Sequence, residues 1–133
     1  MLKVYTDAAT NPQTKKSGGG LLIVGDVQQQ LAVPLTETTN HEAELAIIIY
    51  ALQYLLEHDL HQQSIFLYSD SKTAIKILDQ GHTKNNRFQP YLAQFNQISA
   101  KFQLLILQWV PESKNKGADN LARQGLKLQD RRK

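Results

Sequence analysis

Apolar runs short enough to be β-strands alternate along this chain with longer segments whose apolar residues recur at helical intervals. The strand-length runs are Leu2 to Thr6, Gly18 to Val24, Gln28 to Val33, Ser64 to Ser69 and Gln103 to Val110. The helical segments are Thr39 to about Glu57, Ser71 to Gln80, about Pro90 to Lys101, and Asn115 to about Gln129. Strands that alternate with helices favour a mixed sheet in which helices cover the parallel strands. The pattern therefore predicts an α/β fold.

Polar and glycine-containing segments separate these elements. Asn11 to Ser17 is predicted to be a loop, Gly25-Asp26 a hairpin turn, and Gly81 the end of a helix. A chain of 133 residues corresponds to one domain of ordinary size. We expect a single domain over residues 1–133, with a core of about 2–128 and a basic, solvated tail at 129–133.

The composition excludes several classes of function. Because the chain has no cysteine, it cannot carry a disulfide framework, a thiolate nucleophile or a cysteine-ligated zinc site. The longest apolar run, Ala46 to Leu52, is too short to span a bilayer, and Asp7 interrupts the N-terminus before a signal-peptide core can form. We therefore expect a cytoplasmic protein with no membrane contact. Lys and Arg outnumber Asp and Glu by 15 to 12, and the net charge of +3 mildly favours a polyanionic partner.

Four acidic residues lie where acids are uncommon. Asp7 and Asp70 follow apolar strand patterns, at the sheet edge where open α/β sheets bind ligands. Glu44 and Asp119 lie on the apolar stripes of their helices, near each helix N-terminus, and such stripes face the core. Converging buried carboxylates repel one another unless a cation neutralises them. Oxygen ligands select hard cations such as Mg²⁺ or Mn²⁺, so the four acids predict a site for these ions.

Each acid also has a simpler interpretation. Glu44 is a favourable charge at a helix N-terminus, and Asp70 is placed to cap the helix that follows it. Asp119 is four residues before Arg123 and can pair with it. The combination of all four, each in a specific local sequence, favours the metal-site interpretation.

Four segments resemble a known family. They are Tyr5-Thr6-Asp7-Ala8-Ala9, Thr38-Thr39-Asn40-His41-Glu42-Ala43-Glu44-Leu45, Tyr68-Ser69-Asp70-Ser71, and Trp109-Val110-Pro111 followed by Asn115-Lys116-Gly117-Ala118-Asp119-Asn120-Leu121-Ala122. In this order they resemble the four motifs of type 1 ribonuclease H over about residues 2 to 128, and the last resembles the short-loop branch of the family. The resemblance implies a five-stranded mixed sheet whose first three strands are antiparallel, with helices on both faces.

The same resemblance implies a chemistry. Two divalent ions, Mg²⁺ or Mn²⁺, would be held over a phosphodiester of the RNA strand of an RNA–DNA hybrid by Asp7, Glu44, Asp70 and Asp119. Two ions about 3.5–4 Å apart stabilise both the attacking and the leaving oxygen of such a reaction. The implied enzyme is a metal-dependent endoribonuclease that leaves 3′-hydroxyl and 5′-phosphate ends. No protein nucleophile is required.

Two positions depart from the family pattern. Many members carry a histidine in the loop before the last helix, whereas residues 111–117 contain none. Glu112 and Asn115 offer substitutes within this segment, and His41 is a third candidate, although a surface role for His41 is favoured. Ala8 stands where the family usually has glycine, and its methyl group would crowd a backbone that approaches the RNA.

The expected substrate is the hybrid itself. By resemblance, Asn11 and Asn40 lie in loops that contact ribose 2′-hydroxyls and backbone, and Thr39 matches a position that grips a DNA-strand phosphate. Lys15 and Lys16 would add phosphate contacts. We expect a monomer with no obligate protein partner. Two alternatives stay open at this point: a non-catalytic nucleic-acid-binding module of the same fold, and another two-metal nuclease that acts on DNA.

Overall fold

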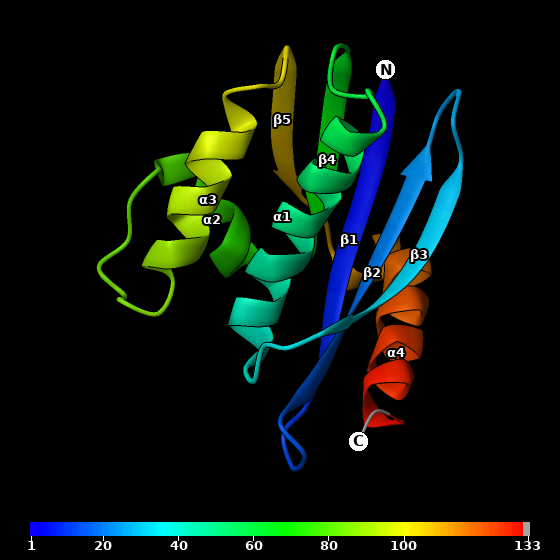
Figure 1. Ribbon diagram of the computed structural model, residues 1–133, viewed down its shortest axis with the longest axis vertical. Helices are drawn as coiled ribbons and strands as arrows, with labels where there is room; N and C mark the ends of the chain where they lie inside the picture. The colour runs from blue at the N-terminus through cyan, green and yellow to red at the C-terminus, as the bar shows by residue number, and fades with distance from the viewer. Residues whose placement is uncertain (132–133) are drawn as a thin grey trace.

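A computed structural model describes residues 1–131, and its elements follow the predicted order (Figure 1). The strands are β1 (Leu2–Asn11), β2 (Lys16–Val24), β3 (Gln29–Leu35), β4 (Ser64–Ser69) and β5 (Leu104–Trp109). The helices are α1 (Asn40–Glu57), α2 (Lys72–Gln80), α3 (Gln89–Ser99), the short 3₁₀ helix η1 (Glu112–Lys114) and α4 (Lys116–Asp130). The basic residues Arg132 and Lys133 of the predicted tail lie outside the described residues.

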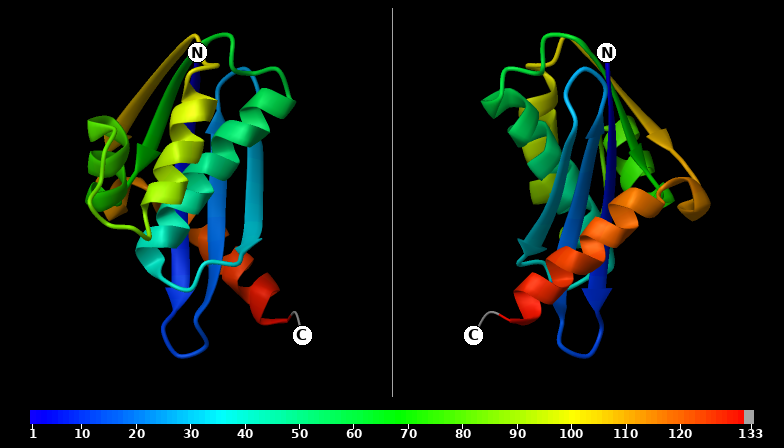
Figure 2. Two further views of the ribbon diagram at one scale, coloured as in Figure 1. Left: turned by 60° about the vertical axis from the view of Figure 1, so that its left-hand side comes forward. Right: turned by 90° about the vertical axis from the view of Figure 1, so that its right-hand side faces the viewer.

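The five strands form one mixed sheet in the order β3-β2-β1-β4-β5. The first three strands pair antiparallel, while β4 lies parallel to both β1 and β5. Helices α1, α2 and α3 cover one face of the sheet, and α4 crosses the other (Figure 2). The predicted five-stranded mixed sheet with helices on both faces is confirmed. No helix among residues 1–131 is long and apolar enough to cross a membrane.

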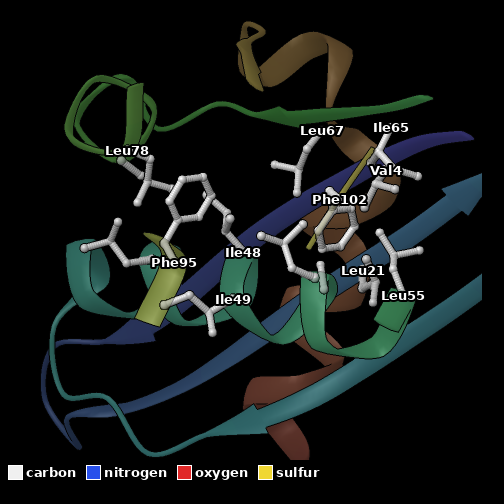
Figure 3. Packing of buried hydrophobic residues seen from close by; sticks show 14 of the residues in the cluster. Val4, Leu21, Ile48, Ile49, Leu55, Ile65, Leu67, Leu78, Phe95 and Phe102 are labelled. Atoms are coloured by element: carbon white, nitrogen blue, oxygen red, sulfur yellow. The ribbon is translucent and has the colours of Figure 1, made fainter. Parts of the chain in front are cut away.

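The main hydrophobic core lies between the sheet and α1. Helix α1 begins directly after Thr39, the predicted start, and the Thr39 side chain accepts a capping hydrogen bond from the Glu42 amide at 3.4 Å. The α1 stripe packs on apolar side chains of the sheet and of α2 and α3 (Figure 3). The labelled residues of this cluster are Val4, Leu21, Ile48, Ile49, Leu55, Ile65, Leu67, Leu78, Phe95 and Phe102.

Helix α4 approaches the sheet much more closely, because glycines remove the side chains between them. A Cβ atom added to Gly18 would lie 2.0 Å from the backbone nitrogen of Leu126, and one added to Gly20 would lie 2.1 Å from the Ala118 carbonyl oxygen. From the helix side, a Cβ on Gly125 would meet the Val33 carbonyl oxygen at 2.5 Å. The glycines of β2 therefore serve close backbone packing. They set the height of α4 above the sheet.

Strand β1 is longer than predicted. The sequence indicated a strand that ends at Thr6 and a loop over Asn11 to Ser17, but β1 continues to Asn11 and β2 begins at Lys16. The extra residues pair only with β2, and the hydroxyls of Thr10 and Ser17 meet at 2.7 Å across the hairpin. These polar residues lack the apolar signal of a strand, so the cross-strand partner supplies the stability.

Candidate active site

Asp7 and Asp70 come together where the parallel strand pairing ends. Thr6 opposite Ser69 is the last pair between β1 and β4, so the next residue of each chain segment is an acid. The sequence had indicated that Asp7 follows the end of the first strand. In the structure Asp7 lies within β1, because β1 continues alongside β2. The two acids therefore meet at the C-terminal end of β4, where Asp70 follows the strand and Asp7 lies beside it.

Glu44 reaches the same place from α1, just beyond the first turn of the helix. Its side chain is buried, and its Oε1 accepts a hydrogen bond of 3.0 Å from the backbone amide of Ala8. The second oxygen, Oε2, is also buried and has no hydrogen-bond donor among residues 1–131. Asp7, Glu44 and Asp70 each offer a carboxylate oxygen within 4.8 Å of the others. The predicted convergence of these three acids is thus present in the structure.

The electrostatics of this cluster favour a bound cation. Burial, followed by the charge of Asp70, raises the pKa of the Asp7 carboxyl from 3.8 to about 7. Burial, followed by the charge of Asp7, raises the pKa of the Glu44 carboxyl well above its usual value. Both shifts arise because these carboxylates are buried and lie close to other acids. An all-oxygen donor set with an unpaired buried carboxylate oxygen fits Mg²⁺ or Mn²⁺.

Asp119 lines the same pocket but is arranged differently. The pocket has a volume of about 180 Å³ and is lined by Asp7, Ala8, Asn40, Glu44, Asp70, Glu112, Asp119 and Arg123. Asp119 lies in the first turn of α4, and its carboxylate stands apart from the cluster of three. It pairs with Arg123 at 3.3 Å, one helical turn further on. The pairing considered in the sequence is therefore formed, at the rim of the predicted site.

Asn115 has a structural role that the sequence did not indicate. Its side chain is buried, and its Nδ2 donates to the Thr6 carbonyl oxygen at 2.9 Å and to Asp70 Oδ2 at 3.5 Å. The indole N–H of Trp109 also donates, at 3.1 Å, to the Asp70 carbonyl oxygen. Trp109 at the end of β5 and Asn115 directly before α4 thus both hold Asp70. An Asn just before a helix indicates a cap, and that ordinary signal concealed this role.

The predicted substrate-binding residues fall into two groups. Asn40 lines the acidic pocket, and Thr39 caps α1 beside it. Asn11, Lys15 and Lys16 belong to the β1–β2 hairpin, outside the lining of that pocket. The Asn11 side chain folds the hairpin, since its Oδ1 accepts hydrogen bonds from the amides of residues 13 and 14.

His41 lies outside the acidic pocket as well. It is exposed, and its ring packs edge-on against Phe88 with the ring centroids 6.3 Å apart. It borders a wider depression that also includes Trp109, Lys72 and Glu112. Glu112, in η1, borders both the acidic pocket and this depression. The segment between β5 and α4 thus brings one acid to the edge of the acidic pocket.

A single sheet with this strand order and an acidic pocket beside the end of β4 defines a ribonuclease H-like α/β domain. The family described as RNase H matches residues 1–127, and the chain belongs to this family. A relative in Enterococcus faecalis (strain ATCC 700802 / V583), named "Putative hydrolase EbsB", is 45% identical over 127 residues, which is 95% of this chain and 94% of the relative.

Solved structures share the fold. RNase H1 from the halophilic archaeon Halobacterium salinarum NRC-1 has a TM-score of 0.83 at 22% identity, covering 96% of this chain and 98% of that one. LC11-RNase H1, solved in complex with an RNA/DNA hybrid, has a TM-score of 0.85 at 22% identity and the same coverage. The family, together with the grouped acids, supports a nuclease activity.

Proposed function

We propose that this protein is a metal-dependent endoribonuclease that hydrolyses the RNA strand of RNA–DNA hybrids and leaves 3′-hydroxyl and 5′-phosphate ends. The observation that carries the proposal is the cluster of Asp7, Glu44 and Asp70, whose carboxylate oxygens lie within 4.8 Å of one another in a chain of the RNase H family. A module that only bound a polyanion would gain nothing from buried negative charge at this position.

In this proposal, two Mg²⁺ or Mn²⁺ ions are held by Asp7, Glu44, Asp70 and Asp119. Bound divalent cations supply Lewis-acid stabilisation of the charge that develops on the phosphodiester oxygens. Glu44 is fixed by the Ala8 amide, and Asp70 by Asn115, so these carboxylates are held in place before any ion arrives. Asp119 must exchange its contact with Arg123 for the ion. All four acids come from one chain, which supports action as a monomer.

The hybrid is proposed as the substrate because LC11-RNase H1 shares the fold and was solved with such a hybrid. Asn40 borders the acidic pocket, where it is placed to contact ribose or backbone. Thr39 at the start of α1 and the hairpin residues Asn11, Lys15 and Lys16 are proposed as further contacts to the sugar-phosphate backbones. Backbone contacts position the duplex, whereas the 2′-hydroxyl identifies the RNA strand.

The decisive test is cleavage of labelled RNA–DNA hybrid, double-stranded RNA and double-stranded DNA in Mg²⁺, Mn²⁺ or EDTA. We expect hybrid cleavage with either metal and none in EDTA. Asp70→Asn keeps the shape of the side chain but removes the charge shared with Asp7. Loss of metal stabilisation worth several kcal/mol should lower hybrid cleavage by about 10³-fold or more. Hybrid binding should persist, because the phosphate contacts lie elsewhere.

Asp79→Asn is the matched control, since Asp79 is an exposed acid of α2 outside the acidic pocket. It should cleave at the wild-type rate. The melting temperature of Asp70→Asn in EDTA should equal or exceed that of the wild type, because repulsion with Asp7 is relieved. Near wild-type cleavage by Asp70→Asn would refute the metal site, and preferential cleavage of double-stranded DNA would refute the substrate.

A further inference from the structure

Asn115 contacts Asp70, the residue before Asp7, and the backbone of Asp119. Its Nδ2 donates to the carbonyl oxygen of Thr6, the residue directly before Asp7, and also to the Asp70 carboxylate. The backbone carbonyl oxygen of Asn115 accepts a hydrogen bond of 3.0 Å from the backbone amide of Asp119, in the first turn of α4. One buried side chain thus fixes the start of α4 relative to β1 and to the end of β4.

The Asn115 side chain does not do what an asparagine at this position usually does. Asn115 is the N-cap of α4, yet its side chain makes no capping hydrogen bond. A side-chain cap is ordinarily worth about 1 kcal/mol to a helix. The Oδ1 atom is buried and has no donor within the described part of the chain, which is a further cost of about 1–3 kcal/mol for a buried polar group. The chain forgoes both contributions while it keeps the two donations of Nδ2.

The orientation of the amide follows from its neighbours. Thr6 offers a backbone carbonyl oxygen and Asp70 a carboxylate oxygen, and both accept hydrogen bonds. The nitrogen of the Asn115 amide must therefore face them, which leaves Oδ1 on the other side. A serine at the same position can cap the helix, but it is too short to bridge to both acceptors.

We propose that Asn115 is a positioning residue of the acidic site. Its amide fixes the Asp70 carboxylate and sets the place of Asp119 relative to Asp7, so that the carboxylates are arranged for divalent cations before binding. This inference rests on the proposed function only in taking the acids as metal ligands. Groups that hold metal ligands in this way typically change metal affinity or activity by about 10–100-fold when they are mutated.

Three variants separate positioning from simple capping. Asn115→Ala removes both roles, whereas Asn115→Ser keeps a capping oxygen and loses the bridge. Asn120→Ser is the matched control, because Asn120 is an exposed residue of the same helix. Each variant is measured by Mn²⁺ titration calorimetry, by thermal melting in EDTA, and by steady-state cleavage of hybrid at saturating Mg²⁺.

We expect Asn115→Ser to melt closer to the wild type than Asn115→Ala does, yet to bind Mn²⁺ about 10–100-fold more weakly. Its kcat should fall while the KM for hybrid stays within about twofold, since the bridge contacts carboxylates and not phosphates. Asn120→Ser should match the wild type in all three measurements. Asn115→Ser with wild-type Mn²⁺ affinity and kcat would overturn the inference.

The design also separates this inference from the proposed function. A wild-type protein that binds Mn²⁺ without cleaving hybrid would overturn the proposed activity, while weaker Mn²⁺ binding by Asn115→Ser would still uphold the positioning role. A wild-type protein that binds no divalent cation would overturn both.

Discussion

At the scale of single residues, the ionisation of Asp7 affects the stability of the metal-free protein. Its pKa is raised to about 7 by burial and by the charge of Asp70, whereas the unfolded chain has an ordinary carboxyl near 3.8. Between these values the folded state holds a proton that the unfolded state has released. Metal-free stability should therefore fall as pH rises from about 4 to 7, and it should be highest at the acidic end of this window.

Asp7→Asn should remove the Asp7 part of this pH dependence. In EDTA, Asp7 alone should contribute a loss on the order of 1 kcal/mol per pH unit, because one pKa unit corresponds to about 1.4 kcal/mol. Denaturant unfolding of both proteins from pH 4 to 8 provides the measurement. Parallel pH profiles for the variant and the wild type would contradict the raised pKa.

Arg123 is predicted to compete with metal for Asp119. The two side chains pair across one helical turn, and both are partly or largely exposed, so the pair is worth only about 0.3–0.5 kcal/mol. Arg123→Gln should therefore tighten Mn²⁺ binding by about twofold. Arg131→Gln, at an exposed position outside the pocket, is the control and should leave the affinity unchanged. Weaker binding by Arg123→Gln would show that the arginine assists the ion.

The site was predictable from the sequence wherever local patterns carried it. Asp7, Glu44 and Asp70 follow from strand ends and a helix stripe, and the structure brings their carboxylates together. The contacts of Asn115 could not be predicted, because its partners are distant in the chain. Thr6 precedes it by 109 positions and Asp70 by 45. Nothing in the local sequence distinguishes a capping asparagine from one whose amide faces a distant carboxylate.

At the scale of elements, the fold was largely predictable and the hairpin was not. Strand β4 has the limits that its apolar run indicated, and α1 begins directly after Thr39, the predicted start of that helix. The β1–β2 hairpin was underestimated because its outer residues are polar and become strand only by pairing with each other. The helix η1 was also missed, since three residues are too short for a periodic signal.

The length of this hairpin affects how Lys15 and Lys16 would meet a substrate. Both lie at its turn, at the opposite end of the molecule from the N-terminus (Figure 1). If each neutralises one phosphate, the double variant Lys15→Gln/Lys16→Gln should bind hybrid more weakly. Its salt dependence should drop by about 0.7–0.9 in log–log slope for each lysine.

A salt titration of hybrid affinity gives this slope directly. The control is Lys3→Gln/Lys101→Gln, which removes the same charge from exposed positions away from the turn of the hairpin. The same slope for both double variants would mean that the hairpin effect is one of net charge alone.

The contact between α4 and β2 yields a prediction about packing. Gly18→Ala would place a methyl group against the backbone of Leu126 and Gly125, and backbone atoms cannot rotate away. We expect a loss of at least about 3 kcal/mol in unfolding free energy, at the upper end of overpacking effects. Gly117→Ala is the milder control, because its added Cβ would meet only the flexible end of Leu22 at 3.0 Å. Equal stability of the two variants would mean that α4 can lift from the sheet at little cost.

At the scale of the whole molecule, the four proposed ligands come from β1, α1, the end of β4 and α4. Such a site exists only in the folded chain, so an ion that binds it stabilises the fold by mass action. At pH 8, Mn²⁺ at 100 times its dissociation constant should add about 2.7 kcal/mol and raise the melting temperature by roughly 10 °C over EDTA. At pH 5 the rise should be smaller, because the ion must displace protons from Asp7 and Glu44.

The same comparison with Asp70→Asn serves as the control for the melting experiment, because the variant should lose most of the rise at pH 8. An equal rise in wild type and variant would indicate that Mn²⁺ stabilises the protein at some other place.

Helix α4 follows all five strands in the chain, so during synthesis β1, β2 and β3 leave the ribosome well before the helix that covers their second face. Until α4 is made, the sheet face that it will cover presents backbone at Gly18 and Gly20 instead of large apolar side chains. A nascent sheet of this kind exposes less apolar surface to chaperones and to other incompletely folded chains. The glycines that let α4 pack closely would then also limit aggregation of the incomplete chain until α4 folds and brings Asp119 to the site.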